Sequence, residues 1–223
     1  MRRRSKIPLL LIVLAMASWS AMASAAEPEW KTIFDGKTLE GWQEFNGKKG
    51  NWDVVDGLIH CKGKGGGASL ETVADYSNFE LELEYRMEKG GNSGVYLRIP
   101  LDAAKIGNPS YTGMEIQLLD DLSPEYAHLH PEQYCGSVYD VVAAKREFVK
   151  PAGEWGKIDI VCDKRHVKVT LNDHEIVKAD LDDYKAKYPT HPGIRPEATT
   201  GHVGLQNHTG PLGFRNVRIR VLE

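Results

Sequence analysis

The chain lacks several patterns that would assign it to a well-known class. It has neither the C-x-x-C nor the H-E-x-x-H spacing, so neither a structural nor a catalytic zinc site is expected. The Gly63–Gly67 run GKGGG is not followed by Lys-Ser/Thr and a helix, which argues against a phosphate-binding loop. There is no internal repeat. Only Ser123–His130 and Asp182–Lys187 are helical candidates, and both predict short loop helices.

Cysteine is scarce, with three residues in 223: Cys61, Cys135 and Cys162. In an exported protein one pair could form a disulfide and leave one free thiol. Cys61 and Cys162 lie in strand-like runs, where buried and unpaired cysteines are at least as frequent. The sequence leaves both alternatives open.

Long hydrophobic runs are also missing. The apolar run Ile7–Ala17 is shorter than the about 20 residues that span a membrane. It follows a basic start and precedes Ala23-Ser24-Ala25, which predicts a secretory signal peptide over residues 1–25 with cleavage near Ala26. A transmembrane anchor is the weaker alternative. We therefore expect a single mature domain over residues 26–223, secreted or periplasmic.

The mature chain has no excess of basic charge. Loss of the four basic residues of the leader lowers the formal net charge from −3 to −7. A mildly acidic, exported protein is a poor candidate for binding nucleic acid or an anionic membrane.

Alternating strands dominate what remains. Phe79–Met87 reads FELELEYRM, with five apolar residues against three glutamates and an arginine. Asp56-Gly57 and Asp163-Lys164-Arg165 each join two such runs as hairpins. Short strands at this spacing predict an all-β sandwich of two antiparallel sheets.

Three strands share a further pattern, because each ends in a small polar cluster. They lie in Gly91–Pro100, Gly113–Asp121 and Gly201–Gly210. Side chains of one parity face one side of a sheet. Val95, Leu97 and Ile99 should therefore oppose Tyr96 and Arg98. By the same reasoning the polar side includes Glu115 and Gln117 of the second strand, and Gln206 and His208 of the third. If the strands are neighbours, they form a polar groove of the kind that binds carbohydrate.

These segments, together with Thr32–Gln43, Pro151–Asp173 and Gly204–Arg220, resemble the 3-keto-disaccharide hydrolase domain family over nearly the whole mature chain. The resemblance implies a concanavalin A-like lectin/glucanase jelly roll with a concave substrate face. It also implies secretion and action on 3-keto-glycosides. Two positions depart from the family pattern: Gly156 stands where asparagine is usual, and Asn207 precedes His208 where an acid is common.

The chemistry of such a substrate sets what the site requires. A ketone at C3 acidifies the C2 proton, so that a base can remove it and the C1 substituent can leave by elimination. Water then adds, and the net result is hydrolysis. This route needs a base near C2, donors or cations at the C3 oxygen and an acid for the leaving group. It needs no paired carboxylates and no cofactor.

Three residues are the catalytic candidates. Glu115 is the one carboxylate on the polar parity of its strand and could act as base or acid; the alternative is a solvent-facing glutamate. His208 can transfer protons near neutral pH, or it could be a turn residue. Arg98 could hold the enolate oxygen, or form an ion pair with Glu115 across the sheet.

Six further residues are candidates for binding substrate. Tyr96, Gln117 and Gln206 would orient sugar hydroxyls, and Asn92 either does so or forms a turn. Asp120, with Asp121, could bind sugar or a Ca²⁺-like ion, although two carboxylates are too few ligands by themselves. Lys145 is a candidate for the oxyanion. The candidates are Tyr96, Asn92, Gln117, Gln206, Asp120 and Lys145.

Two other functions remain open at this point. The same scaffold could be a non-catalytic carbohydrate-binding module. Alternatively, Glu82 or Glu84 could serve an ordinary glycosidase of the laminarinase type, although their plain alternation with apolar residues favours a solvated outer face.

Overall fold

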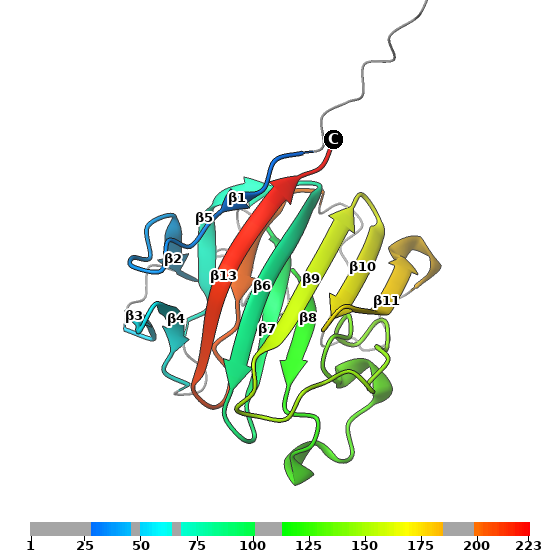
Figure 1. The fold of residues 1–223 in the computed structure, drawn as a ribbon. Helices are drawn as coiled ribbons and strands as arrows, with labels where there is room; N and C mark the ends of the chain where they lie inside the picture. Colours follow the sequence, from blue (N-terminus) through cyan, green and yellow to red (C-terminus); the bar gives the residue numbers. More distant parts are fainter. Residues whose placement is uncertain (1–27, 46–49, 64–67, 101–112, 185–198) are drawn as a thin grey trace, which may run out of the picture.

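The protein is a sandwich of two antiparallel sheets (Figure 1). The computed structural model describes residues 28–45, 50–63, 68–100, 113–184 and 199–223. The expected signal peptide lies outside these ranges. In the described part of the chain, no helix combines the length and apolarity needed to cross a membrane.

The larger sheet has eight strands, ordered β11-β10-β9-β6-β13-β4-β3 with β1 paired to β13. Its strands are β1 (Lys31–Thr32), β3 (Trp52–Val55), β4 (Leu58–Cys61), β6 (Phe79–Met87), β9 (Gly156–Asp163), β10 (His166–Leu171), β11 (His174–Asp180) and β13 (Leu212–Val221).

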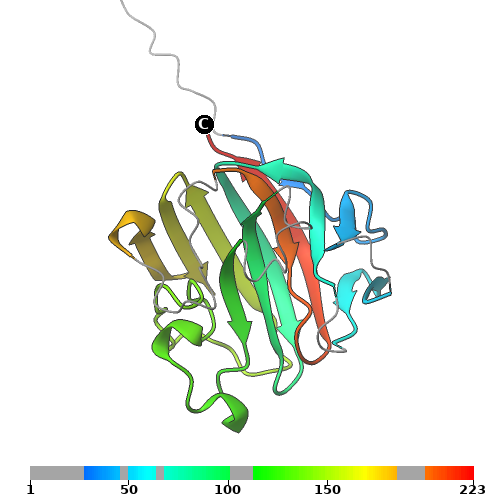
Figure 2. The same ribbon diagram turned by 180° about the vertical axis from the view of Figure 1, so that it is seen from behind.

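The smaller sheet has five strands, ordered β2-β5-β12-β7-β8, and lies on the near side in Figure 2. Its strands are β2 (Trp42–Glu44), β5 (Leu70–Tyr76), β12 (Gly201–Leu205), β7 (Asn92–Ile99) and β8 (Met114–Leu119). The described parts of the two predicted helical segments hold short 3₁₀ turns, η2 (Pro124–Tyr126) and η4 (Leu181–Asp183), and residues 185–187 of the second segment lie outside the described ranges. A third turn, η3 (Pro131–Gln133), follows η2.

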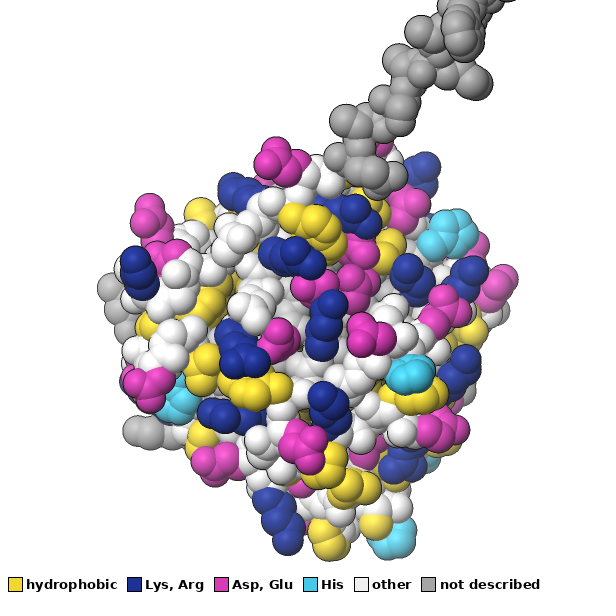
Figure 3. Space-filling model, in the orientation of Figure 1, with side chains coloured by type: hydrophobic (Ala, Val, Ile, Leu, Met, Phe, Trp, Pro, Cys, Tyr) yellow, Lys and Arg dark blue, Asp and Glu magenta, His cyan; other side chains and the backbone are white. Residues whose placement is uncertain are grey.

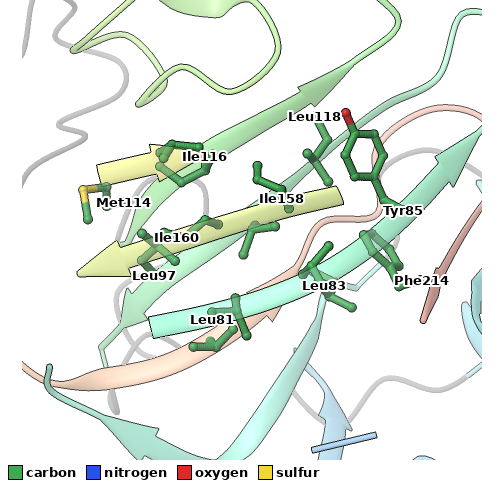
Figure 4. Packing of buried hydrophobic residues seen from close by; sticks show 14 of the residues in the cluster. Leu81, Leu83, Tyr85, Leu97, Met114, Ile116, Leu118, Ile158, Ile160 and Phe214 are labelled. Atoms are coloured by element: carbon green, nitrogen blue, oxygen red, sulfur yellow. The ribbon is translucent and has the colours of Figure 1, made fainter. Parts of the chain in front are cut away.

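The core lies between the sheets because each strand sends alternate side chains inward (Figure 4). Both sheets contribute aliphatic residues that are at most 1% exposed: Leu81, Leu83, Ile158 and Ile160 from the larger sheet, and Leu97, Ile116 and Leu118 from the smaller. Cys61, Cys135 and Cys162 are free and buried, so none of them forms a disulfide.

The outward face of the eight-stranded sheet is covered with interleaved acidic and basic side chains (Figure 3). Glutamates of β6 pair with arginines of β13: Glu80 with Arg220, Glu82 with Arg218, and Glu84 with Arg215. Although partial burial opposes it, hydrogen bonds from Arg218 and Lys157 lower the pKa of Glu82. Glu82 and Glu84 are thus ion-paired carboxylates, ill suited to donate a proton to a glycosidic oxygen.

Candidate functional site

A row of residues crosses the outward face of the five-stranded sheet. Backbone register pairs Gln43 with Glu71, Glu71 with Gly204, Gly204 with Tyr96, and Tyr96 with Glu115. Directly paired residues of an antiparallel sheet lie on the same face. The alternate residues of these strands point into the core, so the row faces away from it. The sheet therefore carries two glutamates on one face, separated by two strands.

Glu115 lies across the backbone of β7. Gly94 pairs with Gln117 of β8, and its carbonyl oxygen accepts a 2.9 Å hydrogen bond from the amide of Gln206. A Cβ atom at Gly94 would lie 2.0 Å from Oε1 of Glu115. The carboxyl group therefore occupies the notch above Gly94, between Gln117 and Gln206. We call Glu115, Gln117 and Gln206 the Glu115 cluster.

The Glu115 cluster contains unsatisfied acceptors. Oε1 of Glu115, Oε1 of Gln117 and Oε1 of Gln206 are buried and have no hydrogen-bond partner among the described residues. The Nε2 of Gln117 donates to the carbonyl of Gln133 over 3.4 Å, which fixes the orientation of that amide. Because buried polar atoms are normally paired, three free acceptor oxygens require a ligand or solvent that brings donors. Hydroxyl groups are such donors.

Glu115 is held in a neutral form. Its side chain is 6% exposed. Burial, and next the negative charge of Asp140, raise the pKa of Glu115 to about 8. Asp140 is itself buried, and its Oδ1 accepts a 2.8 Å hydrogen bond from Nε2 of Gln133. No pattern in the sequence singles out Asp140, because it lies in an irregular segment after β8.

His208 lies two residues beyond Gln206 and is exposed. Reciprocal backbone hydrogen bonds between Asn92 and Thr209, of 2.9 and 3.0 Å, hold this segment beside β7. The Nδ1 of His208 is 2.7 Å from Oγ1 of Thr209, which orients the ring. Partial desolvation lowers the pKa of His208 below its usual value of 6.5. The imidazole is therefore neutral at pH 7 and able to accept a proton.

Several predicted site residues thus come together. Glu115, Gln117, Tyr96 and Gln206 share the outward face of the five-stranded sheet, and Asn92 lies on the same parity of β7 as Tyr96. Tyr96 is only 1% exposed and packs in a small hydrophobic cluster with Phe45, Ala68 and Ile99.

Arg98 does not join them, and the predicted alternation is wrong from this residue onward. Its φ of 54° interrupts the regular strand, so Ile99 joins Tyr96 on the outward face. The Arg98 guanidinium instead donates to the carbonyl oxygens of Ser77, at 2.8 Å, and Lys164, at 2.6 Å. Lys164 lies in the β9–β10 turn of the other sheet. Arg98 therefore links the two sheets and forms no ion pair with Glu115.

Asp120 and Lys145 are also engaged elsewhere. Oδ2 of Asp120 accepts a 2.9 Å hydrogen bond from the amide of Gly90. Asp121 accepts from the Cys135 amide at 3.0 Å and faces Arg146. Lys145 is exposed and reaches toward the carbonyl of Glu175 on β11. Within the described ranges, no three histidine, cysteine, aspartate or glutamate residues form a group that could hold a metal ion.

Glu71 is a further residue of this sheet face that the strand patterns do not predict. Nε2 of Gln43 donates to its Oε1 over 3.1 Å, and burial raises the pKa of Glu71, opposed by the charge of His202. The strand that carries it, Leu70–Tyr76, reads LETVADY, in which alternation of apolar and polar residues is weak. Leu70 and Glu71 are adjacent and therefore face opposite sides of the strand. This local alternation is the sequence signal that could have identified Glu71 as an outward-facing residue.

A β-sandwich whose sheet face carries carboxyl and amide groups with free acceptor oxygens belongs with the carbohydrate-active proteins of concanavalin A-like fold. The comparison with protein families is more specific. Residues 29–220 match the family described as the 3-keto-alpha-glucoside-1,2-lyase-like domain, and the chain belongs to this family.

Individual relatives agree with this assignment. The chain is 31% identical to a 3-keto-disaccharide hydrolase of Bacteroides thetaiotaomicron over 226 aligned positions, which cover 86% of this chain and 78% of that protein. A crystal structure from Parabacteroides distasonis, provisionally named a glycosyl hydrolase, superposes with a TM-score of 0.74 at 27% identity and covers 87% and 94% of the two chains.

A more distant structure shows the fold alone. The carbohydrate-binding module CBM66 of Bacillus subtilis superposes with a TM-score of 0.52 at 16% identity, covering 81% of this chain and 95% of the module. The predicted concanavalin A-like sandwich is confirmed. Homology to a hydrolase makes the chain an enzyme, so the binding-module alternative is set aside.

Proposed function

We propose that the protein cleaves 3-keto-disaccharides and related 3-keto-glycosides by removing the C2 proton, eliminating the C1 substituent and adding water. The observation that carries this proposal is the Glu115 cluster, in which a buried neutral carboxyl group and two amide oxygens lack partners among the described residues. A neutral polyol supplies the hydroxyl donors that these oxygens require, and a neutral acid suits enolate chemistry.

The steps balance without a redox partner. The base takes the C2 proton, and the electrons of the C2–H bond form a C2=C3 double bond as the carbonyl becomes an enol or enolate. The C3 carbonyl then re-forms, the C1–O bond breaks and a C1=C2 bond remains. The departing alkoxide takes one proton. Water then adds across C1=C2 and gives the free 3-keto sugar.

Ordinary glycosidase chemistry on this face fits less well. Glu71 and Glu115 are three strand spacings apart, roughly 14 Å between their backbones, whereas the paired carboxyl groups of ordinary glycosidases lie about 5–9.5 Å apart. Asp140 is close enough to influence Glu115, but it is 1% exposed and already bonded to Gln133. Neither pairing provides two substrate-facing carboxylates at the required separation.

We further propose that the enzyme is exported and that its own side chains supply the acid and base. The Ca²⁺-like site considered at Asp120 and Asp121 does not fit, because backbone amides and Arg146 occupy those carboxylates. The carbohydrate substrate is the partner that the site is built to bind.

The test is to incubate the protein with a 3-keto-disaccharide and with the same disaccharide not oxidised at C3. Only the keto compound should be cleaved. In D₂O, deuterium should enter C2 of the product at the earliest times, faster than free 3-keto sugar exchanges by itself. Cleavage of both sugars at similar rates, or cleavage without enzyme-dependent label at C2, contradicts the elimination route. The direct product before hydration, the C1=C2 enone, should be detected by its ultraviolet absorbance or by mass.

A further inference from the structure

We infer that Glu115 acts as a neutral acid on the C3 oxygen of the substrate, whereas His208 is the base that removes the C2 proton. This inference rests on the proposed function and assigns the roles that the chemistry alone leaves interchangeable. Four observations carry it: the notch at Gly94, the engagement of the nearby cations, the position of Asp140 and the orientation of His208.

Two cationic side chains that could have assisted at the C3 oxygen, Arg98 and Lys145, are engaged elsewhere in the described structure. An enolate oxygen in a water-poor pocket needs a donor or a positive charge. Arg98 is bonded to carbonyl oxygens between the sheets, and Lys145 reaches toward β11 of the other sheet. The amide nitrogen of Gln117 already donates to Gln133. Around Gly94, a protonated Glu115 and the amide nitrogen of Gln206 are candidate donors.

The surroundings of Glu115 favour the protonated form of its carboxyl group. Asp140 is the charged group that acts on Glu115, Tyr96 is its register partner on β7, and the backbone amide of Tyr139 donates to the Glu115 carbonyl over 2.9 Å. None of these groups is a cation. Burial and the Asp140 carboxylate both favour the uncharged carboxyl group, so at neutral pH Glu115 has an O–H to donate.

The position of the Glu115 carboxyl group suits a donor to the substrate ketone. The carboxyl group lies over Gly94, where a side chain would otherwise stand, and is flanked by the free oxygens of Gln117 and Gln206. These oxygens can accept from hydroxyl groups that neighbour the ketone. The sugar ring is thereby held with its carbonyl toward the donor. His208 lies on the extension of β12, and Nδ1 is within hydrogen-bond distance of Thr209 Oγ1. In the tautomer that the proposal requires, Nδ1–H donates to Thr209, so Nε2 carries the lone pair that accepts the C2 proton.

With these roles, the proton transfers balance over one catalytic cycle. Nε2 of His208 takes the C2 proton as the C2=C3 bond forms, and the O–H of neutral Glu115 donates a hydrogen bond to the developing enolate oxygen. When the carbonyl re-forms, Glu115 still holds its proton, and the departing C1 alkoxide takes the proton from the imidazolium. Each group ends in its starting state. A deprotonated Glu115 would instead place a negative charge beside a developing enolate, which raises the barrier.

The experiment compares Glu115→Gln with Glu115→Ala. Glutamine keeps the size and one N–H donor but cannot accept a C2 proton. We expect Glu115→Gln to lose less than about 10-fold in kcat/KM and Glu115→Ala to lose about 10²–10³-fold, the usual effect of removing one oxyanion donor. The two variants should lose activity equally if Glu115 is the base, and that result overturns the inference.

The pH dependence supplies a second readout that a purely structural role does not move. For the wild type, kcat/KM should fall at high pH with a midpoint at about 8 as Glu115 ionises. Glu115→Gln should lack this alkaline limb. Asp140→Asn removes the charge that raises the Glu115 pKa, so the limb should move to lower pH. An alkaline limb unchanged in both variants overturns the inference. Failure of the proposed function is distinct, because the wild type then cleaves no 3-keto-glycoside at all.

Discussion

Oε1 of Glu115 lies 2.0 Å from the position that a Cβ atom would take at Gly94. Glycine at this position therefore makes room for the proposed acid. Gly94 does not have a positive φ, so alanine fits its backbone, but its Cβ would displace the Glu115 side chain from Cγ to the carboxyl group. We expect Gly94→Ala to reduce kcat/KM by about 10²-fold, the cost of misplacing a catalytic group by roughly 1 Å. Thermal unfolding should change little. Full activity would show that Glu115 need not lie in this notch.

Arg98 should matter for stability rather than chemistry. It is 4% exposed and donates to the carbonyl oxygens of Ser77 and Lys164. Arg98→Ala removes these two part-buried hydrogen bonds from a charged donor, which should lower the free energy of unfolding by about 2–4 kcal/mol. Arg165→Ala in the nearby turn is the matched control, because its ion pair with Asp182 is partly exposed and worth about 1 kcal/mol or less. Urea unfolding measures both. A large loss of kcat in folded Arg98→Ala with unchanged stability contradicts this assignment.

Glu115 and Arg98 show how far the position of a site residue could be predicted from the sequence. The parity of Met114–Leu119 correctly placed Glu115 and Gln117 on one outward face, because a regular strand sends alternate residues to opposite sides. The same rule failed at Arg98, where a positive φ interrupts the strand. Such a conformation is uncommon for residues other than glycine and leaves no mark in the sequence.

Long-range pairing explains the rest of what was missed. Glu71 belongs to the site because β5 pairs with β12, 130 or so residues later in the chain. Asp140 belongs to it because the segment around Val138 bridges to Ile116 at the edge of β8. Neither contact follows from local periodicity. The strand Phe79–Met87, in contrast, was predicted with its bounds, since its alternation is uninterrupted over nine residues.

The outward face of the eight-stranded sheet should make stability depend on pH. Burial of Asp159, and next the charge of Glu80, raise the pKa of Asp159 to about 7. The unfolded chain releases this proton near the ordinary pKa of 3.8. The free energy of unfolding that depends on Asp159 should therefore be unaffected below about pH 4, fall as pH rises from about 4 to 7, and stay level above. The free energy of unfolding of Asp159→Asn minus that of the wild type, measured by urea unfolding, should be larger at pH 8 than at pH 4. Equal differences at both pH values contradict the raised pKa.

Export makes a prediction at the N-terminus. The basic start, short apolar run and Ala23-Ser24-Ala25 predict removal of residues 1–25. Protein recovered from the periplasm or medium of its host should have the intact mass of residues 26–223. Replacing Ala23 and Ala25 by bulky residues should leave the leader attached. Full-length chain retained in the membrane fraction of the unmodified protein would instead identify an anchor.

His208 should determine the acidic side of the activity profile. As the proposed base it works only when neutral, and partial desolvation lowers its pKa below 6.5. The value of kcat/KM should therefore rise with pH through a midpoint below 6.5 and reach a plateau before the alkaline limb near 8. His208→Asn should lose about 10²–10⁴-fold in kcat/KM, the usual contribution of a general base, and should lose the acid limb and the enzyme-dependent deuterium at C2 together. His166→Asn is the control, because His166 lies on the other sheet, exposed beside Asp180. It should keep the wild-type profile. Labelling at C2 that persists in His208→Asn at the wild-type rate would transfer the role of base to another residue.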